Sequence, residues 1–252
     1  MQTQQISYPL TNQGFLNVLS LSFNQFVQSG TSRSTAKLKP LHGAIARDLA
    51  YRLGASFSIQ SQGVGNDKEE SIMGRYVDKK VDITISKKDA TTHKDIPVAG
   101  IAVKFVMQNY SQNSNNYFEN MLGETANIRA NKCPYFQIFI ILDRLPYYKK
   151  ETKRITKWEQ FTLHNAEKYK ILSNDNVDMF FHTPNKTLLY VIHIPDNNAL
   201  LGATSQEYMD YYAQCKAPIV LSSEQYGIFG NSIIINDYEA FIDKVYHCIM
   251  AI

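Results

Sequence analysis

The segment that most limits the fold is Tyr135 to Leu142, which is apolar except for Gln137. At eight residues it is far shorter than the roughly 20 residues that a membrane-spanning helix needs. It also lacks the alternation of apolar and polar residues that marks a strand with one face in water. A strand of this kind is buried on both faces, so helices must cover both sides of its sheet. We therefore expect an α/β fold with a three-layer αβα core around a central mixed sheet.

The segments before this strand supply candidates for the other layers. Apolar residues recur at three- and four-residue spacing in Thr11 to Gln28 and in Leu38 to Leu53, which predicts two amphipathic helices. The period then changes to two, which is typical of strands. We expect strands at Ser56 to Gln60, Ile72 to Val77, Val81 to Ser86 and Val98 to Val106, which form a hairpin or a meander with Asp78 to Lys80 as the turn between the second and the third.

The remaining pattern continues the alternation of helices and strands. A polar run from Gln108 to Asn116 leads into a predicted helix that ends at Arg129, ahead of Pro134. Later in the chain we expect a strand at Leu188 to Ile194 and helices at Trp158 to Leu172, Ser205 to Gln214 and Tyr238 to Met250. No linker-like composition separates these segments. We expect a single domain, 1–252, with its core at about 38–143 and an elaboration at 144–252.

The composition indicates the class of protein and the cellular compartment in which we expect it. The chain has 252 residues with 26 Lys+Arg, 23 Asp+Glu and 44% hydrophobic residues, which is typical of a globular protein. Met1 to Leu10 shows no basic cluster followed by an apolar stretch, so we expect no secretory signal and a cytoplasmic location. Cys133, Cys215 and Cys248 lie far apart, which favours reduced thiols over disulfides or a zinc site.

Two basic stretches are candidates for binding phosphate. Between Tyr147 and Lys157 the cations Lys149, Lys150, Lys153 and Arg154 are interleaved with tyrosines and precede Trp158. A second stretch runs from Lys79 to Lys94. Each is either a solvated loop or part of a surface that binds phosphate, and the sequence leaves both alternatives open.

Charged residues interrupt two of the expected strands. Asp82 lies within Val81 to Ile85, and Lys104 lies within Gly100 to Phe105. Such charges are costly to bury without partners, so the two form either a structural ion pair or part of a site. Metal-dependent cleavage of phosphodiesters uses carboxylates to hold a hard cation and an ammonium to stabilise developing negative charge. Residues two apart on a strand project to the same face, which would bring such groups together.

These residues, taken with the order of the elements, resemble the PD-(D/E)XK nuclease superfamily, and type II restriction endonucleases in particular. The resemblance covers Leu38 to Asp143 and includes Asp82, Ala102-Val103-Lys104 and Asn116-Tyr117-Phe118-Glu119. It implies a sequence-specific, Mg²⁺-dependent endonuclease for double-stranded DNA. It also implies that Asp82 and the Val103 carbonyl bind the metal and that Lys104 assists the attacking water. Because palindromic sites have two-fold symmetry, a homodimer is expected, with 144–252 serving DNA contact or dimerisation.

The sequence departs from the family pattern at Ala102, where the family has Glu or Asp. Three explanations are open. The chain is an engineered inactive form, or a naturally inactive relative that only binds nucleic acid, or it takes its second acid from the following helix. Glu119 is the nearer candidate on that helix and Glu124 is the other. The intact strand pattern around position 102 favours loss of the acid there.

We also expect particular polar and basic residues to contact DNA. Asn and Gln side chains can pair with the adenine edge in the major groove, which makes Gln108, Asn109 and Asn113 candidates for base recognition. The alternative is a polar loop in which Ser114 or Asn115 caps the helix. Cations expected at phosphates are Arg75, Lys79, Lys80, Lys149, Lys150, Lys153 and Arg154.

Overall fold

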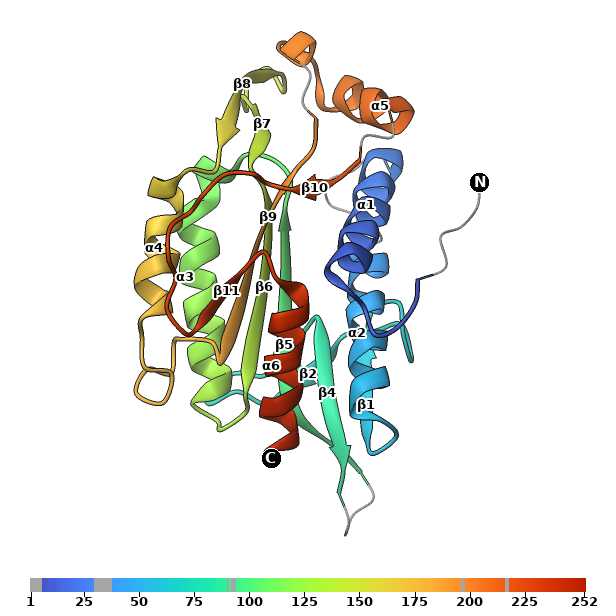
Figure 1. Cartoon of the computed structure of the whole chain (residues 1–252), viewed down its shortest axis with the longest axis vertical. Helices are drawn as coiled ribbons and strands as arrows, with labels where there is room; N and C mark the ends of the chain where they lie inside the picture. The colour runs from blue at the N-terminus through green and yellow to red at the C-terminus, as the bar shows by residue number, and fades with distance from the viewer. Residues whose placement is uncertain (1–5, 30–37, 90, 92–93, 196–197, 216–217) are drawn as a thin grey trace.

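A mixed sheet of seven strands forms the centre of the computed structural model, which describes residues 6–29, 38–89, 91, 94–195, 198–215 and 218–252 (Figure 1). In spatial order the strands are β1 (Phe57–Ser61), β4 (Ile83–Lys88), β5 (Asp95–Val106), β6 (Tyr135–Leu142), β9 (Lys186–His193) and β10 (Val220–Leu221), and β11 (Ile233–Ile235) also pairs with β9. The strands β1, β4 and β5 pair antiparallel, β5, β6, β9 and β11 run parallel, and β10 pairs antiparallel with β9.

Helices cover both faces of this sheet. On one side lie α1 (Asn12–Ser29), α2 (Lys39–Leu53) and α6 (Tyr238–Met250), and on the other lie α3 (Tyr110–Arg129) and α4 (Leu163–Ser173) (Figure 1). The helix α5 (Ser205–Cys215) packs on α1, and a short 3₁₀ turn, η2, spans Asn198–Leu200. Every residue of β6 is buried between the layers. The expected α/β fold with a three-layer core is confirmed.

The two halves of the chain share the main hydrophobic core. One cluster of buried side chains runs from Leu10 near the start of the chain to Ile249 near its end. The ring of Phe15 on α1 stacks on Tyr238 of α6 with 4.2 Å between ring centroids, and it meets Tyr190 of β9 edge-on. Residues after 143 therefore supply one of the central strands and part of a helical layer.

Two small hairpins stand outside the main sheet, and one differs from expectation. They are β2 (Glu70–Ile72) with β3 (Lys79–Val81), and β7 (Arg144–Tyr148) with β8 (Ile155–Gln160). The expected hairpin of Ile72 to Val77 with Val81 to Ser86 is wrong, because Ile72 pairs with Lys79 and the turn spans 73–78. The peptides of Tyr76 and Val77 bond to the Asn127 side chain on α3 instead of to a strand.

Two helix boundaries also differ from expectation. The helix α3 begins at Tyr110 rather than at Asn116, because the backbone N–H and hydroxyl of Ser111 both donate to the buried Glu159 carboxylate. The residues Ser114 and Asn115 therefore lie inside the helix and do not cap it. Residues 158–160 belong to β8, where Trp158 pairs with Pro146, and α4 starts only after Thr162.

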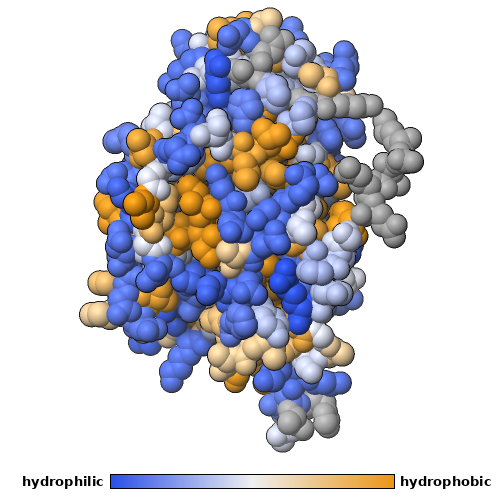
Figure 2. Space-filling model, in the orientation of Figure 1, coloured by the Kyte–Doolittle hydropathy of each residue, from blue (hydrophilic) through white to orange (hydrophobic). Residues whose placement is uncertain are grey.

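Other expected segments agree with the structure to within a few residues. These are the helices α1, α2, α5 and α6 and the strands β1, β5, β6 and β9. The described residues do not include Met1 to Gln5, where we expect no secretory signal. They also do not include Ala90, Thr92 and His93 of the second basic stretch. Within the described ranges, every helix is too short or too polar to cross a membrane. Figure 2 shows hydrophilic and hydrophobic residues interspersed over one face of the molecule.

The buried Asp48 side chain connects three helices on one side of the sheet. Its carboxylate accepts hydrogen bonds from the Leu10 backbone N–H at 2.9 Å, the Tyr238 hydroxyl at 2.9 Å and Arg52 Nε at 3.2 Å. The side chain has no solvent exposure. The carboxylate thus links the residues that lead into α1 with α2 and α6.

We predict that Asp48→Ala lowers the free energy of unfolding by about 3 kcal/mol, because two buried donors and a guanidinium lose their acceptor. Urea denaturation monitored by circular dichroism measures the change. The matched control is Asp243→Ala on α6, whose half-exposed side chain pairs with His247 and whose loss should cost less than about 0.5 kcal/mol. Equal losses in the two variants would contradict the role assigned to Asp48.

Candidate active site

Asp82 is fixed at the point where β3 ends and β4 begins. Its Oδ2 accepts a hydrogen bond from the Val103 backbone N–H at 2.7 Å, and its backbone carbonyl accepts one from Ser61 Oγ at 2.7 Å. The next residue, Ile83, pairs with Ile101 on β5. The carboxylate therefore lies against β5 beside position 102.

Ala102 and Lys104 project from β5 toward α3. Ala102 packs against a small cluster that includes Ile128 of α3 and Tyr135 of β6. Lys104 Nζ lies 4.7 Å from the ring centroid of Tyr117, also on α3, and the residue is exposed to solvent. Asp82 and Lys104 influence each other electrostatically without forming a direct ion pair in the described part of the chain. This geometry gives no support to a simple structural ion pair.

The acid of α3 that reaches Asp82 is Glu124. The Glu124 carboxylate forms an ion pair with Lys79 of β3, and its negative charge raises the pKa of Asp82. Glu119, about one and a half turns earlier on the helix, instead acts on Lys168 of α4: burial lowers the pKa of Lys168, and the charge of Glu119 opposes that shift. Of Glu119 and Glu124, the acid whose charge acts on Asp82 is Glu124.

The environment of Asp82 disfavours its negative charge. Burial is the main cause that raises the pKa of Asp82, to about 6, and the charge of Glu124 adds to this effect. The hydrogen bond from Val103 and the charges of Lys104 and Lys79 act in the opposite direction. A half-buried carboxylate with a second carboxylate nearby gains stability when a cation binds between them.

The donor set fits a hard divalent cation. Mg²⁺ prefers oxygen ligands, retains several waters and commonly uses only one or two protein carboxylates. Asp82 and Glu124 supply two carboxylates, and the Val103 carbonyl lies on the adjoining strand. No group of three or more His, Cys, Asp or Glu side chains that could hold a metal occurs among the described residues, so they offer no closed zinc-type site.

The polar residues expected to recognise bases have structural partners. Asn109 binds Tyr148 of β7 twice: its Oδ1 accepts from the Tyr148 N–H at 2.8 Å and its Nδ2 donates to the Tyr148 carbonyl at 3.1 Å. Asn113 Nδ2 donates to the Asn109 carbonyl at 3.3 Å. Gln108 precedes them in a half-buried position. These contacts join the start of α3 to the β7–β8 hairpin.

The cations of the β7–β8 hairpin divide into two groups. Lys149, Lys150 and Lys153 are exposed at its turn. Arg154 is engaged with a neighbouring segment, because its Nη1 donates to the Gly202 carbonyl at 2.6 Å and lies 3.9 Å from Glu207. The exposed cations Arg75 and Lys80 lie on the other hairpin, close to Lys79.

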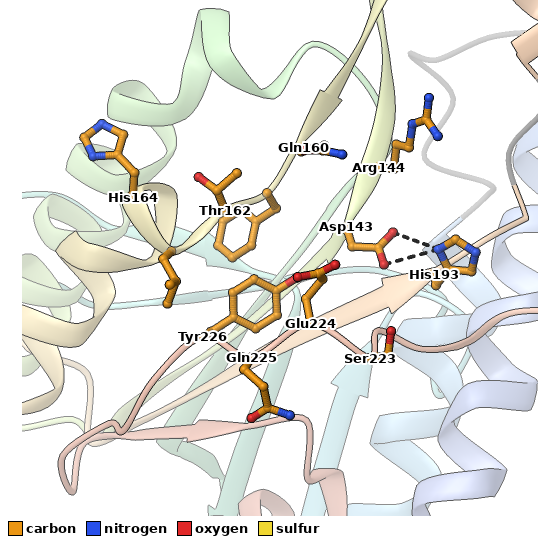
Figure 3. Close-up of a pocket in the computed structure, with 12 residues that line it drawn as sticks. Asp143, Arg144, Gln160, Thr162, His164, His193, Ser223, Glu224, Gln225 and Tyr226 are labelled. Atoms are coloured by element: carbon orange, nitrogen blue, oxygen red, sulfur yellow. Dashed lines mark hydrogen bonds and ion pairs between the residues drawn. The ribbon is translucent and has the colours of Figure 1, made fainter.

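Sequence reasoning missed a second group of polar residues, at the carboxyl ends of β6 and β9. There Asp143 and His193 point toward each other, with 3.1 Å between Asp143 Oδ1 and His193 Nδ1, in a pocket of about 540 Å³ (Figure 3). Ser222 Oγ donates to Asp143 Oδ2 at 2.8 Å, so the serine binds the acid and not the imidazole. This arrangement differs from a serine nucleophile activated by histidine. The position of Asp143 directly after a buried strand was the available signal.

Comparisons with known proteins give no relative for this chain. No protein family matches it, and neither do any curated proteins or solved structures.

We predict that Asp82→Asn stabilises the metal-free protein at pH 8. A carboxyl whose pKa rises from 3.8 to about 6 on folding is disfavoured when ionised, so this cost is complete above pH 6 and absent below about pH 4. The variant should gain up to about 3 kcal/mol in free energy of unfolding at pH 8 and less than about 0.5 kcal/mol at pH 4. Urea denaturation in a chelator measures both values.

The matched control for this prediction is Glu119→Gln, which should show no such difference between the two pH values. Added Mg²⁺ should stabilise the unmodified protein and leave Asp82→Asn unchanged, because only the ionised carboxylate attracts the cation. A variant that is less stable than the unmodified protein at pH 8 would contradict the assigned environment of Asp82.

Proposed function

We propose that this protein is a divalent-metal-dependent endonuclease that hydrolyses phosphodiester bonds in double-stranded DNA. The observation that carries the proposal is the grouping of Asp82, Glu124 and Lys104 where β4, β5 and α3 meet. Two carboxylates with one amine, half exposed on a rigid sheet, are the groups that metal-assisted phosphate chemistry uses.

The order of elements supports the same proposal. A helix, three antiparallel strands, a helix and a parallel strand occur in the order α2, β1, β4, β5, α3 and β6, with the β2–β3 hairpin inserted between β1 and β4. This is the arrangement expected for the PD-(D/E)XK nucleases that the sequence resembles. In those enzymes the aspartate precedes the strand that carries the lysine, as Asp82 precedes Lys104 here. Type II restriction enzymes of this kind act as two-fold dimers on palindromic sites, and we extend that expectation to this chain.

The proposed mechanism assigns one role to each group. Asp82, Glu124 and the Val103 carbonyl would hold Mg²⁺, which when bound withdraws charge from a phosphate oxygen and lowers the pKa of a coordinated water. The Val103 N–H fixes the Asp82 carboxylate in place through Oδ2. The exposed Lys104 amine stabilises the negative charge that develops on the phosphate during attack. Tyr117 lies against the amine and restricts its position.

The proximity of Glu124 to Asp82 changes the interpretation of Ala102. Of the three explanations for that residue, the charge interaction between Glu124 and Asp82 supports an acid supplied by the helix. The Ala102 side chain packs with Ile72, Val81 and Tyr135, so a methyl group suits this position. We therefore propose that the chain cleaves DNA as it stands. The alternative is a nuclease-like fold that binds nucleic acid without cutting it.

We predict that Glu124→Gln lowers Mg²⁺-dependent cleavage of plasmid DNA by at least about a hundredfold, because it removes one of two metal-binding charges. Glu119→Gln on the same helix is the matched control and should retain activity within about threefold. Plasmid nicking and linearisation at equal protein concentrations measure both. DNA affinity in Ca²⁺ should be unchanged in both variants.

Other results of this experiment would select a different explanation. If Glu119→Gln abolishes cleavage and Glu124→Gln does not, the second acid is Glu119. If the unmodified chain binds DNA but does not cut it, and Ala102→Glu restores cleavage, the acid was lost at position 102. If the chain and Ala102→Glu both fail to cut any DNA, the nuclease proposal is wrong.

We predict that Lys149, Lys150 and Lys153 contact phosphates. Changing all three to Gln should weaken binding to every DNA sequence and reduce the slope of log K against log[salt] by about 0.9 for each lost contact. Arg154 is left in place because it binds the segment at Gly202. The control is Lys244→Gln, on α6 at the opposite face of the sheet, which should leave the slope unchanged. An unchanged slope in the triple variant would show that the hairpin turn does not touch DNA.

A further inference from the structure

The turn between β2 and β3 has a backbone that is held unusually firmly by α3. The Asn127 side chain accepts hydrogen bonds from the N–H groups of Tyr76 and Val77 and donates one to the Val77 carbonyl at 2.8 Å. The Arg75 N–H also donates to the Asn127 backbone carbonyl at 2.8 Å. A Cβ on Gly74 would overlap Asn127, so the two fit closely. The peptides of this turn are thus fixed to a helix.

The side chains of the same turn are directed into solvent. Met73 is 68% exposed, Tyr76 79% and Val77 64%, whereas Asn127 beneath them is 8% exposed. Arg75 is exposed as well, and its guanidinium carbon lies 5.8 Å from the Tyr76 ring centroid. Large apolar groups held in water on an ordered backbone indicate a contact surface rather than a loosely packed loop.

The turn adjoins the candidate active site. Lys79, the first residue of β3, forms the ion pair with Glu124, and β3 leads directly to Asp82. On α3, Asn127 follows Glu124 by three residues, which is less than one helical turn. A duplex with its scissile phosphate at Asp82 therefore passes close to the turn.

The chemistry of the turn fits DNA. Arg75 and the exposed Lys80 attract phosphates, and an aromatic ring can stack on bases or enter between them. In the narrow minor groove an arginine is attracted by the enhanced negative potential, and an apolar or aromatic side chain can wedge between base steps, which are the two kinds of group that this turn presents. Glu70 and the exposed Asp78 also lie on this hairpin, so its three cations and two acids leave a net charge of 3 − 2 = +1, which favours DNA over a protein partner with an apolar face.

We propose that Arg75 and Tyr76 form a prong that enters the minor groove beside the scissile phosphate, with Arg75 in the groove and the Tyr76 ring wedged against a base step. The inference rests on the proposed function, because it requires DNA at Asp82. The wedge partly unstacks the step and unwinds the duplex. The firm attachment to Asn127 keeps the prong from folding back when it meets the bases.

The test is helix unwinding of a closed circular plasmid. The plasmid is relaxed by a topoisomerase in the presence of saturating protein, with Ca²⁺ in place of Mg²⁺ to prevent cutting, and the change in linking number is read on a gel. The unmodified protein should shift the topoisomer distribution. Tyr76→Phe should retain the shift, because the ring is kept, and Tyr76→Ala should abolish it while binding within about threefold of the unmodified protein.

Matched variants separate the prong from general effects. Tyr51→Ala removes another exposed tyrosine, from α2 across the sheet from α3, and should leave the shift unchanged. Arg75→Ala should weaken binding about tenfold, and netropsin, which occupies the minor groove, should compete with the unmodified protein more strongly than with Arg75→Ala. Thermal unfolding of each variant confirms that the fold is retained.

The outcomes distinguish this inference from the proposed function. If the protein binds DNA but does not unwind it, or if Tyr76→Ala unwinds as well as the unmodified protein, the prong is wrong and the nuclease proposal is unaffected. If the protein does not bind DNA at all, both proposals fail. If Tyr76→Ala changes only the sedimentation of the free protein, the turn is a protein contact and the inference is overturned.

Discussion

The burial of β6 on both faces is the constraint from which the rest of the architecture follows. The strand lies between β5 and β9 and pairs with both in parallel, so its neighbours must come from chain segments separated by crossovers. One crossover contains α3, and the other contains the β7–β8 hairpin and α4. The opposite face is closed by helices from both ends of the sequence, joined through Asp48. A chain that ended at residue 143 would lack β9, the strand that pairs with one edge of β6.

The candidate active site lies where the helices do not fully cover the sheet. The strand β4 begins only at Ile83, so Asp82 sits beyond the regular ladder and uses the Val103 N–H on β5 as its partner. Burial and the nearby Glu124 make its negative charge unfavourable. A site in which a negative charge is unfavourable without a cation nearby is suited to binding a cation. The same features that cost stability in the metal-free protein would thus contribute to metal affinity.

Sequence reasoning located the regular elements but missed contacts between distant residues. The period of the hydrophobic pattern indicated α1, α2, α6, β5 and β6, because each buries a continuous face. The start of α3 depends on Glu159, which is 48 residues away from Ser111, and no local pattern reports that contact. The choice between Glu119 and Glu124 depends likewise on how α3 lies across β5. Spacing along the chain predicted that Asp82 and Lys104 lie near each other, whereas the position of Glu124 depends on the packing of the helix.

The attachment of the β2–β3 turn to Asn127 has a consequence for how this protein can vary. A hairpin turn in solvent usually accepts extra residues at little cost, because only the entropy of closing a longer loop is added. Here an inserted residue would shift the peptides of Tyr76 and Val77 away from the single amide that binds both. In the β7–β8 hairpin the anchors lie at the two ends of the turn, where Asn109 binds Tyr148 and Arg154 binds Gly202, and the described residues show none at Lys150. Related chains should therefore keep the length of the first turn fixed, whereas the second turn should accept insertions between its anchored ends.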